Sequence, residues 1–122
     1  TLENFAGFRD AYGFVASDDV QRAVSLMIHN AVRDIGGSND FFGQLGPTAF
    51  VLVTIPGAQD ALTERIRTRL EQSMDYFYPL KDRGENSPAA SRLKIRVGAL
   101  AHTDGPFKDV EELKARLTKQ LV

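Results

Sequence analysis

The sequence predicts an α+β domain in which helices pack on a mainly antiparallel central sheet. Apolar residues recur at helical spacing in two long segments, 18–35 and 59–78. The segments 41–55 and 93–100 instead show the continuous or alternating apolar pattern that is typical of strands. Helices interleaved with strands in this way cover a sheet. The chain has 122 residues, so we expect residues 1–122 to form a single domain.

Two helices open the predicted order. The first covers residues 2–12, and Gly13 ends it. Its apolar positions follow a three-residue rhythm at Leu2, Phe5 and Phe8. Ser17 is the predicted N-cap of the second helix, 18–35. The core-facing positions of that helix are Val20, Val24, Met27, Ile28, Ala31 and Ile35.

A hairpin and a third helix come next. The strands 41–45 and 50–55 flank a turn that begins at Gly46, and Pro56-Gly57 ends the second strand. Apolar residues then recur every three to four positions, which predicts a helix over 59–78.

The last third of the chain holds one strand and one helix. Residues 79–91 are rich in Pro, Gly, Asn and Ser and predict a loop. Leu93, Ile95 and Val97 alternate with basic residues, which indicates a half-buried strand that continues to Leu100. Asp109 is the expected cap of a final helix that ends near Leu121.

Composition limits the kinds of binding partner and the cellular compartment that we expect for this chain. The net charge is −1, so no basic field favours nucleic acid or an anionic membrane surface. Cysteine is absent from the sequence, which rules out disulfides and fits a reducing compartment. No apolar run approaches the ~20 residues of a membrane span. We therefore expect a cytoplasmic domain with no nucleic-acid partner and no membrane contact in this segment.

Two stretches of the chain match a known family in order and spacing. The hairpin turn reads Gly46-Pro47-Thr48-Ala49-Phe50. Upstream, the residues that complete the pattern are Glu3, Phe5, Asp10, Gly13 and Asp18. With these residues the chain resembles a GGDEF domain, the diguanylate cyclase family, whose turn reads Gly-Gly-(Asp/Glu)-Glu-Phe. Only the first Gly and the Phe of that signature are kept here.

The resemblance implies a fold and a context. The fold would be the palm-like central sheet of nucleotide cyclases, with its first central strand missing before Thr1. A sheet without its middle strand leaves backbone groups unpaired, at a cost comparable to lost hydrogen bonds. We therefore expect the chain to be a fragment of a longer signalling protein, such as a response regulator.

The resemblance also implies that the catalytic residues are lost. The family joins two GTP molecules into cyclic di-GMP, using magnesium that carboxylates hold. The family positions of these acids hold Thr1, Thr48 and Ala49, which carry no carboxylate. We expect no catalytic residue, no bound metal and no cofactor.

Three residues keep a family type at a ligand-binding position. Asp18 and Gly46 match nucleotide-binding positions, and Asp40 matches the acid of the family's inhibitory site for cyclic di-GMP. Each also has a simpler interpretation. Asp18 suits the first turn of any helix, and Gly46 suits any tight turn.

The leading hypothesis is a catalytically inactive GGDEF-like output domain in bacterial signal transduction. It would act by forming a homodimer or by contact with a partner signalling domain. The alternatives are a sensor that binds GTP or cyclic di-GMP, weakly, and an active diguanylate cyclase. An open cleft with Asp18 accessible favours the sensor. A cleft filled by Arg9, Phe14 and Pro47 favours the interaction domain.

Overall fold

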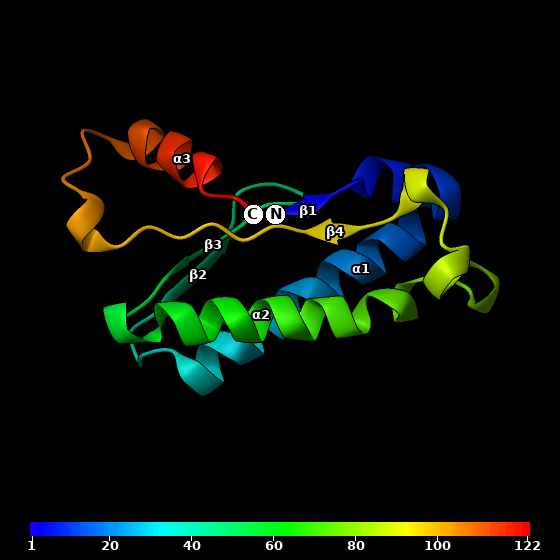
Figure 1. The fold of residues 1–122 in the computed structure, drawn as a ribbon, viewed down its shortest axis with the longest axis horizontal. Coiled ribbons are helices and arrows are strands. Elements are labelled where there is room, and N and C mark those ends of the chain that lie inside the picture. The colour runs from blue at the N-terminus through cyan, green and yellow to red at the C-terminus, as the bar shows by residue number, and fades with distance from the viewer.

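A computed structural model describes residues 1–122, with α2 and most of α1 on one side of the strands β1 and β4 and with α3 on the other (Figure 1). The helices and strands, in chain order, are β1 (Leu2–Glu3), α1 (Phe5–Ile35), β2 (Phe41–Gln44), β3 (Phe50–Val53), α2 (Gln59–Ser73), β4 (Lys94–Ile95) and α3 (Val110–Lys119). The chain is 61% helical, so the core is chiefly helix packed on helix.

The predicted central sheet is wrong. The structure contains two separate two-stranded antiparallel sheets, β1 with β4 and β2 with β3. Leu2 pairs with Ile95 in the first sheet, and Phe41 pairs with Val53 in the second. The only backbone hydrogen bond between β1 and the hairpin runs from the Leu2 N–H to the Thr48 carbonyl, at 2.9 Å. The palm-like arrangement implied by the resemblance is therefore also wrong.

The two sheets stay separate because β1 makes a single backbone hydrogen bond to the hairpin, which is too few to form a ladder. Long-range packing is supplied by α1 and α2 instead, through one buried stripe on each helix. The buried residues of these stripes are Val20, Val24, Ile28, Leu62, Ile66 and Leu70.

The start of α1 also differs from the sequence prediction. Leu2 lies in β1, and the helix begins at Phe5. Gly13 interrupts α1 with φ 89° and ψ 176°, a conformation that favours glycine, and the helix resumes at once. Ser17 is consequently not an N-cap. It is buried inside the helix, and its hydroxyl donates to the Gly13 carbonyl at 2.7 Å.

Other boundaries follow the sequence more closely. The predicted helix over 59–78 is α-helical only to Ser73 and continues as a 3₁₀ turn over Met74–Phe77. The predicted strand over 93–100 forms a ladder only at Lys94–Ile95. The Asp109 cap is confirmed, because its carboxylate accepts from the Glu112 N–H at 2.8 Å.

An aromatic cluster closes the end of the molecule that holds the start of α1. The ring centroid of Phe8 lies 4.9 Å from that of Tyr12 and 5.4 Å from that of Tyr78. The Tyr78 hydroxyl donates to the Ser91 carbonyl at 3.0 Å and accepts from the Leu93 N–H at 2.6 Å. These bonds fix the backbone that leads into β4.

Candidate functional site

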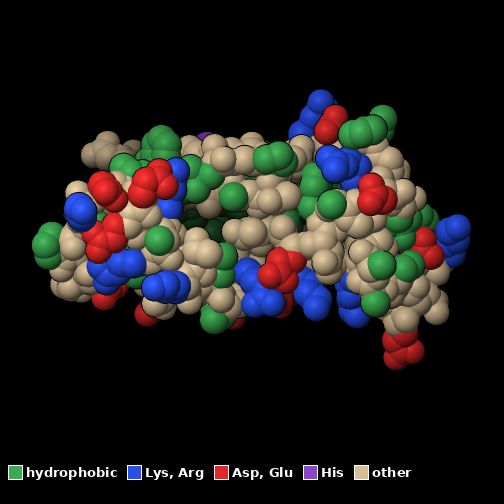
Figure 2. Space-filling view, turned by 90° about the horizontal axis from the view of Figure 1, so that it is seen from above, with side chains coloured by type: hydrophobic (Ala, Val, Ile, Leu, Met, Phe, Trp, Pro, Cys, Tyr) green, Lys and Arg blue, Asp and Glu red, His purple; other side chains and the backbone are tan.

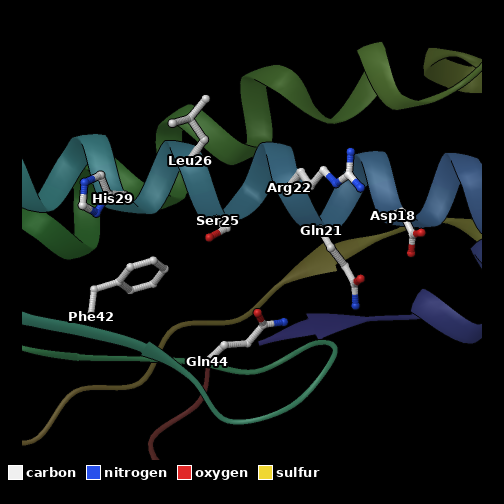
Figure 3. Close-up of a pocket in the computed structure, with 8 residues that line it drawn as sticks. All are labelled: Asp18, Gln21, Arg22, Ser25, Leu26, His29, Phe42 and Gln44. Carbon is white, nitrogen blue, oxygen red and sulfur yellow. The ribbon is translucent and has the colours of Figure 1, made fainter.

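A groove of about 580 Å³ runs between α1 and the hairpin (Figure 3). Its volume lies within the range of small-molecule sites, roughly 300–1,000 Å³. Its lining residues are Asp18, Gln21, Arg22, Ser25, Leu26, His29, Phe42 and Gln44.

Helical periodicity builds one wall of this groove. Asp18, Arg22, Ser25 and His29 are spaced by three or four residues, so they form one stripe on α1. Figure 3 shows Asp18 and Ser25 pointing from α1 toward the side of the strands, whereas the Arg22 side chain runs along the helix and turns away from Phe42. The wall is polar because the apolar stripe of α1 is used against α2.

The two ends of the groove differ in chemistry. Asp18 and Gln21 supply a carboxylate and an amide at one end (Figure 3). At the other end, the His29 and Phe42 rings lie with centroids 6.1 Å apart. The groove therefore offers hydrogen-bonding groups at one end and aromatic surface at the other.

One hydrogen bond ties the hairpin turn to the helix. The Gln21 side-chain amide donates to the Pro47 carbonyl at 2.6 Å. The bond holds the turn against α1 near Asp18, and it uses a polar group that would otherwise face the groove.

The structure brings the three substituted family positions near one another. The hydrogen bond from Leu2 to Thr48 places Thr1 beside the turn. The Ala49 carbonyl accepts from the Leu45 N–H at 2.8 Å, which closes the turn. None of the three side chains at Thr1, Thr48 and Ala49 carries an acid.

The three retained positions do not form one site. Asp18 is exposed within the groove, beyond the first turn after Gly13, so the helix-start interpretation does not explain it. Gly46 has no positive φ, and a Cβ there would meet nothing within 4 Å, so this turn does not require glycine. The Asp40 carboxylate is engaged elsewhere, since it accepts from the Thr54 hydroxyl at 2.5 Å and from the Gly37 N–H at 2.9 Å.

The groove is not filled by the side chains that the sequence suggested. Arg9 and Phe14 are exposed and contact each other, with the guanidinium carbon 5.5 Å from the ring centroid. Neither residue lines the groove. Pro47 approaches it only through the carbonyl that binds Gln21.

Sequence reasoning missed most of the groove wall. Gln21, Arg22 and Ser25 match no residue of the family signature. A signal was present, because these residues form a polar stripe opposite the apolar positions of the same helix. That the hairpin faces this stripe is a tertiary contact, which helical periodicity does not specify.

The structure lacks a metal-binding cluster and a membrane-spanning helix. No three His, Asp or Glu side chains are grouped so as to hold a metal ion. Among the helices, none combines the length and the apolar character needed to cross a bilayer.

Comparison with known proteins gave no match: no family model, no curated protein and no solved structure matches the chain. The GGDEF resemblance therefore rests on the residue pattern alone, and it stays a prediction.

Proposed function

We propose that this chain is a degenerate, non-catalytic GGDEF-like domain of a cytoplasmic signalling protein, and that it acts by contact with a second copy or a partner domain. The observation that carries the proposal is the apolar outer face of the hairpin. Its exposed residues are Phe41, Leu45, Val53 and Ile55, with 56%, 55%, 61% and 51% exposure.

Strand register explains why these residues share one face. Phe41 lies directly opposite Val53, and paired residues of an antiparallel ladder point to the same side. The alternate residues Phe42, Phe50 and Leu52 pack against the core. An apolar patch that the protein itself leaves uncovered is typical of an interaction surface.

The residues at the family's catalytic positions support a non-catalytic role. Magnesium prefers carboxylate and other hard oxygen ligands, and phosphoryl transfer depends on charge neutralisation by the metal. Thr1, Thr48 and Ala49 supply no carboxylate for this purpose.

The double variant Phe41→Ser with Val53→Thr is expected to weaken self-association, or binding of a partner domain, by at least about tenfold, because apolar area leaves the interface. Sedimentation over a concentration series measures the self-association. Leu80→Ser is the matched control, since Leu80 is 79% exposed and lies outside the hairpin. Association that is equally strong in the double variant would contradict the proposal.

A nucleotide sensor is the second candidate, and the groove favours it. Asp18 is accessible there, while Arg9 and Phe14 lie outside. A carboxylate can accept two hydrogen bonds from a guanine edge. The donors that the family uses for the triphosphate are missing, however, because Pro47 lacks an N–H and the family's lysine position holds Ala6. Arg22 is the one arginine or lysine that lines the groove.

GTP is expected to bind to the chain weakly or not at all, since each missing charge-assisted hydrogen bond costs about 1.5–3 kcal/mol. Isothermal calorimetry measures the dissociation constant. A low-micromolar constant that is lost in Asp18→Ala, and kept in Asp19→Ala, would replace the contact hypothesis with the sensor. Asp19 is a suitable control because it is exposed but does not line the groove.

The chain is expected to make no cyclic di-GMP from GTP with either magnesium or manganese. The triple variant Pro47→Gly, Thr48→Asp and Ala49→Glu is expected to make none either. Thr1 and Ala6 would still stand where the family has an acid and a lysine, and residues that act as a unit give little when only some are present. Chromatography of the reaction mixture detects the product. Turnover that scales with the concentration of either protein would contradict this prediction. It would show that the catalytic residues are not at the positions that the family resemblance gives.

A further inference from the structure

The outer side of β2 is an unpaired strand edge. The bond from the Leu45 N–H to the Ala49 carbonyl fixes the alternation of the hairpin ladder. The N–H and C=O groups of Phe42 and Gln44 therefore point away from β3, and no other backbone segment bonds to them. We call these outward groups the β2 edge. A strand that paired with the open side of β3 would leave the β2 edge free, because the two edges lie on opposite sides of the hairpin.

The β2 edge lacks the usual protection against pairing. Charged side chains of both signs are spread over the face seen in Figure 2, and such charges on a strand are a common device against edge pairing. Residues 41–45 read Phe-Phe-Gly-Gln-Leu, with no charged residue and no proline. Another strand can therefore add to this edge without burying a charge.

The β2 edge is complementary to a second copy of itself. Each edge offers the two N–H and two C=O groups of Phe42 and Gln44. When two such strands lie antiparallel about a two-fold axis, Phe42 of one copy bonds to the partner's Gln44, and the reverse. This register uses all of the outward groups, and it places Gly43 on the axis.

The side chains of the outer face fit the same register. The Phe41 ring lies across Gly43, since a Cβ at position 43 would stand 2.9 Å from the Phe41 Cζ. At the axis, the two Phe41 rings would meet above the two glycines. The residue directly opposite Phe41 would be the partner's Leu45. Both side chains are exposed and apolar in the single chain, so pairing removes apolar area from water on both sides of the axis.

We infer that the β2 edge pairs with the β2 edge of a second copy, antiparallel and centred on Gly43, so that two hairpins join into one four-stranded sheet. This inference rests on the proposed contact function, and it names the partner and the register of the contact. The second copy is specified because glycine at the axis makes room for two Phe41 rings, and because Phe41 and Leu45 exchange places across it.

A single cysteine tests the register, because the chain contains none. Gly43→Cys is expected to form a disulfide-linked dimer under mild oxidation, since Cα atoms of a pair that is not hydrogen-bonded lie about 4.5 Å apart, within disulfide range. The added Cβ meets the tip of the Phe41 ring, which is free to rotate away, and a Val51 methyl at 3.7 Å. Gel electrophoresis without reductant measures the rate of cross-linking.

Leu45→Cys is the matched control for the cysteine experiment. Leu45 is exposed on the same face, but in this register its two copies lie about 14 Å apart, four residues along the strand, which is too far for a disulfide. Cross-linking should be at least about tenfold slower than in Gly43→Cys. A mixture of Phe41→Cys and Leu45→Cys chains should form the mixed dimer, because these two positions face each other across the axis.

A proline tests the backbone pairing itself. Gln44→Pro removes a donor of the β2 edge and breaks no backbone hydrogen bond within the chain. Each dimer loses two hydrogen bonds, so its dissociation constant should rise by about tenfold or more in sedimentation equilibrium. Gln44→Ala keeps the N–H and is the control, with an expected change within about twofold. Circular dichroism verifies that both variants are folded.

Three results would overturn the inference: a chain that stays monomeric at millimolar concentration, equally fast cross-linking in Gly43→Cys and Leu45→Cys, or a Gln44→Pro variant that associates as strongly as the parent chain. The Phe41→Ser and Val53→Thr assay separates the two proposals. If that double variant weakens a contact while the Gly43 and Gln44 experiments fail, only the edge pairing is wrong. If none of these changes affects any association, the proposed function fails as well.

Discussion

Phe8→Ala is expected to lower the free energy of unfolding by about 3–5 kcal/mol, the usual cost of removing a buried phenylalanine ring. The Phe8 side chain is 0% exposed and contacts the rings of Tyr12 and Tyr78. Its removal leaves a cavity at the end of the core where β4 begins. Urea unfolding followed by circular dichroism measures the change in free energy.

Phe14→Ala provides the control for this prediction. Phe14 lies in the same helix as Phe8, but it is 74% exposed. We expect its loss to change the free energy of unfolding by no more than about 0.5 kcal/mol, as is usual at surface positions. Equal losses in the two variants would mean that the aromatic cluster does not belong to the core. Only 17 of the 122 residues are buried, so each core ring supplies a large share of the core. The difference in unfolding free energy between the two variants should therefore be large.

Tyr78→Phe is expected to lower the free energy of unfolding by about 1–3 kcal/mol, although the ring is kept. The hydroxyl is the partner of the Leu93 N–H and of the Ser91 carbonyl. Without it, a buried donor and a buried acceptor lose their partners, and each unsatisfied group costs its desolvation. Chemical denaturation measures the loss. Tyr76→Phe is the control, since Tyr76 is 76% exposed and should be nearly neutral.

The same tyrosine predicts a pH dependence. Burial raises the pKa of Tyr78, and the hydrogen bond from Leu93 opposes that shift. Above about pH 10 the unfolded phenol loses its proton while the folded one retains it, so stability falls as the pH rises further. The free energy of unfolding should decline less steeply with alkaline pH in Tyr78→Phe than in the parent chain. An identical slope in both proteins would show that Tyr78 does not contribute.

The two function classes depend on different surfaces of one hairpin. The inner face and the turn border the groove of Asp18, whereas the outer face carries Phe41 and Val53. Variants of the outer face should therefore leave any nucleotide binding intact, and Asp18→Ala should leave association intact. This separation makes the contact and sensor hypotheses testable in the same preparation.

Local patterns predicted the helices well. The predicted helix over 18–35 is helical in the structure, and the one predicted over 59–78 is α-helical as far as Ser73. Asp109 caps the last helix as predicted. The hairpin predicted over 41–55 also forms, with its strands at Phe41–Gln44 and Phe50–Val53. These features depend on side chains three or four residues apart in helices, or on adjacent strands joined by a short turn, so a single sequence contains the information.

Other assignments failed because they depend on distant contacts. Leu2 fits a helical rhythm, yet its pairing with Ile95, 93 positions away, makes it a strand residue. Serine is a common N-cap residue, yet Ser17 is buried in the interior of α1, because the helix resumes directly after Gly13. In both cases tertiary packing overrides a weak local preference.

The sequence by itself determined the helical segments, the hairpin and the absence of acids at Thr1, Thr48 and Ala49, because each is a property of residue type or of near neighbours. Only the tertiary structure decided that the strands form two sheets instead of one. It also decided that Asp18 opens onto a groove, that Asp40 is engaged by Thr54, and that β2 keeps a free edge. The physical reason is that strand pairing and groove walls join segments far apart in the chain, and their geometry depends on how the whole core packs.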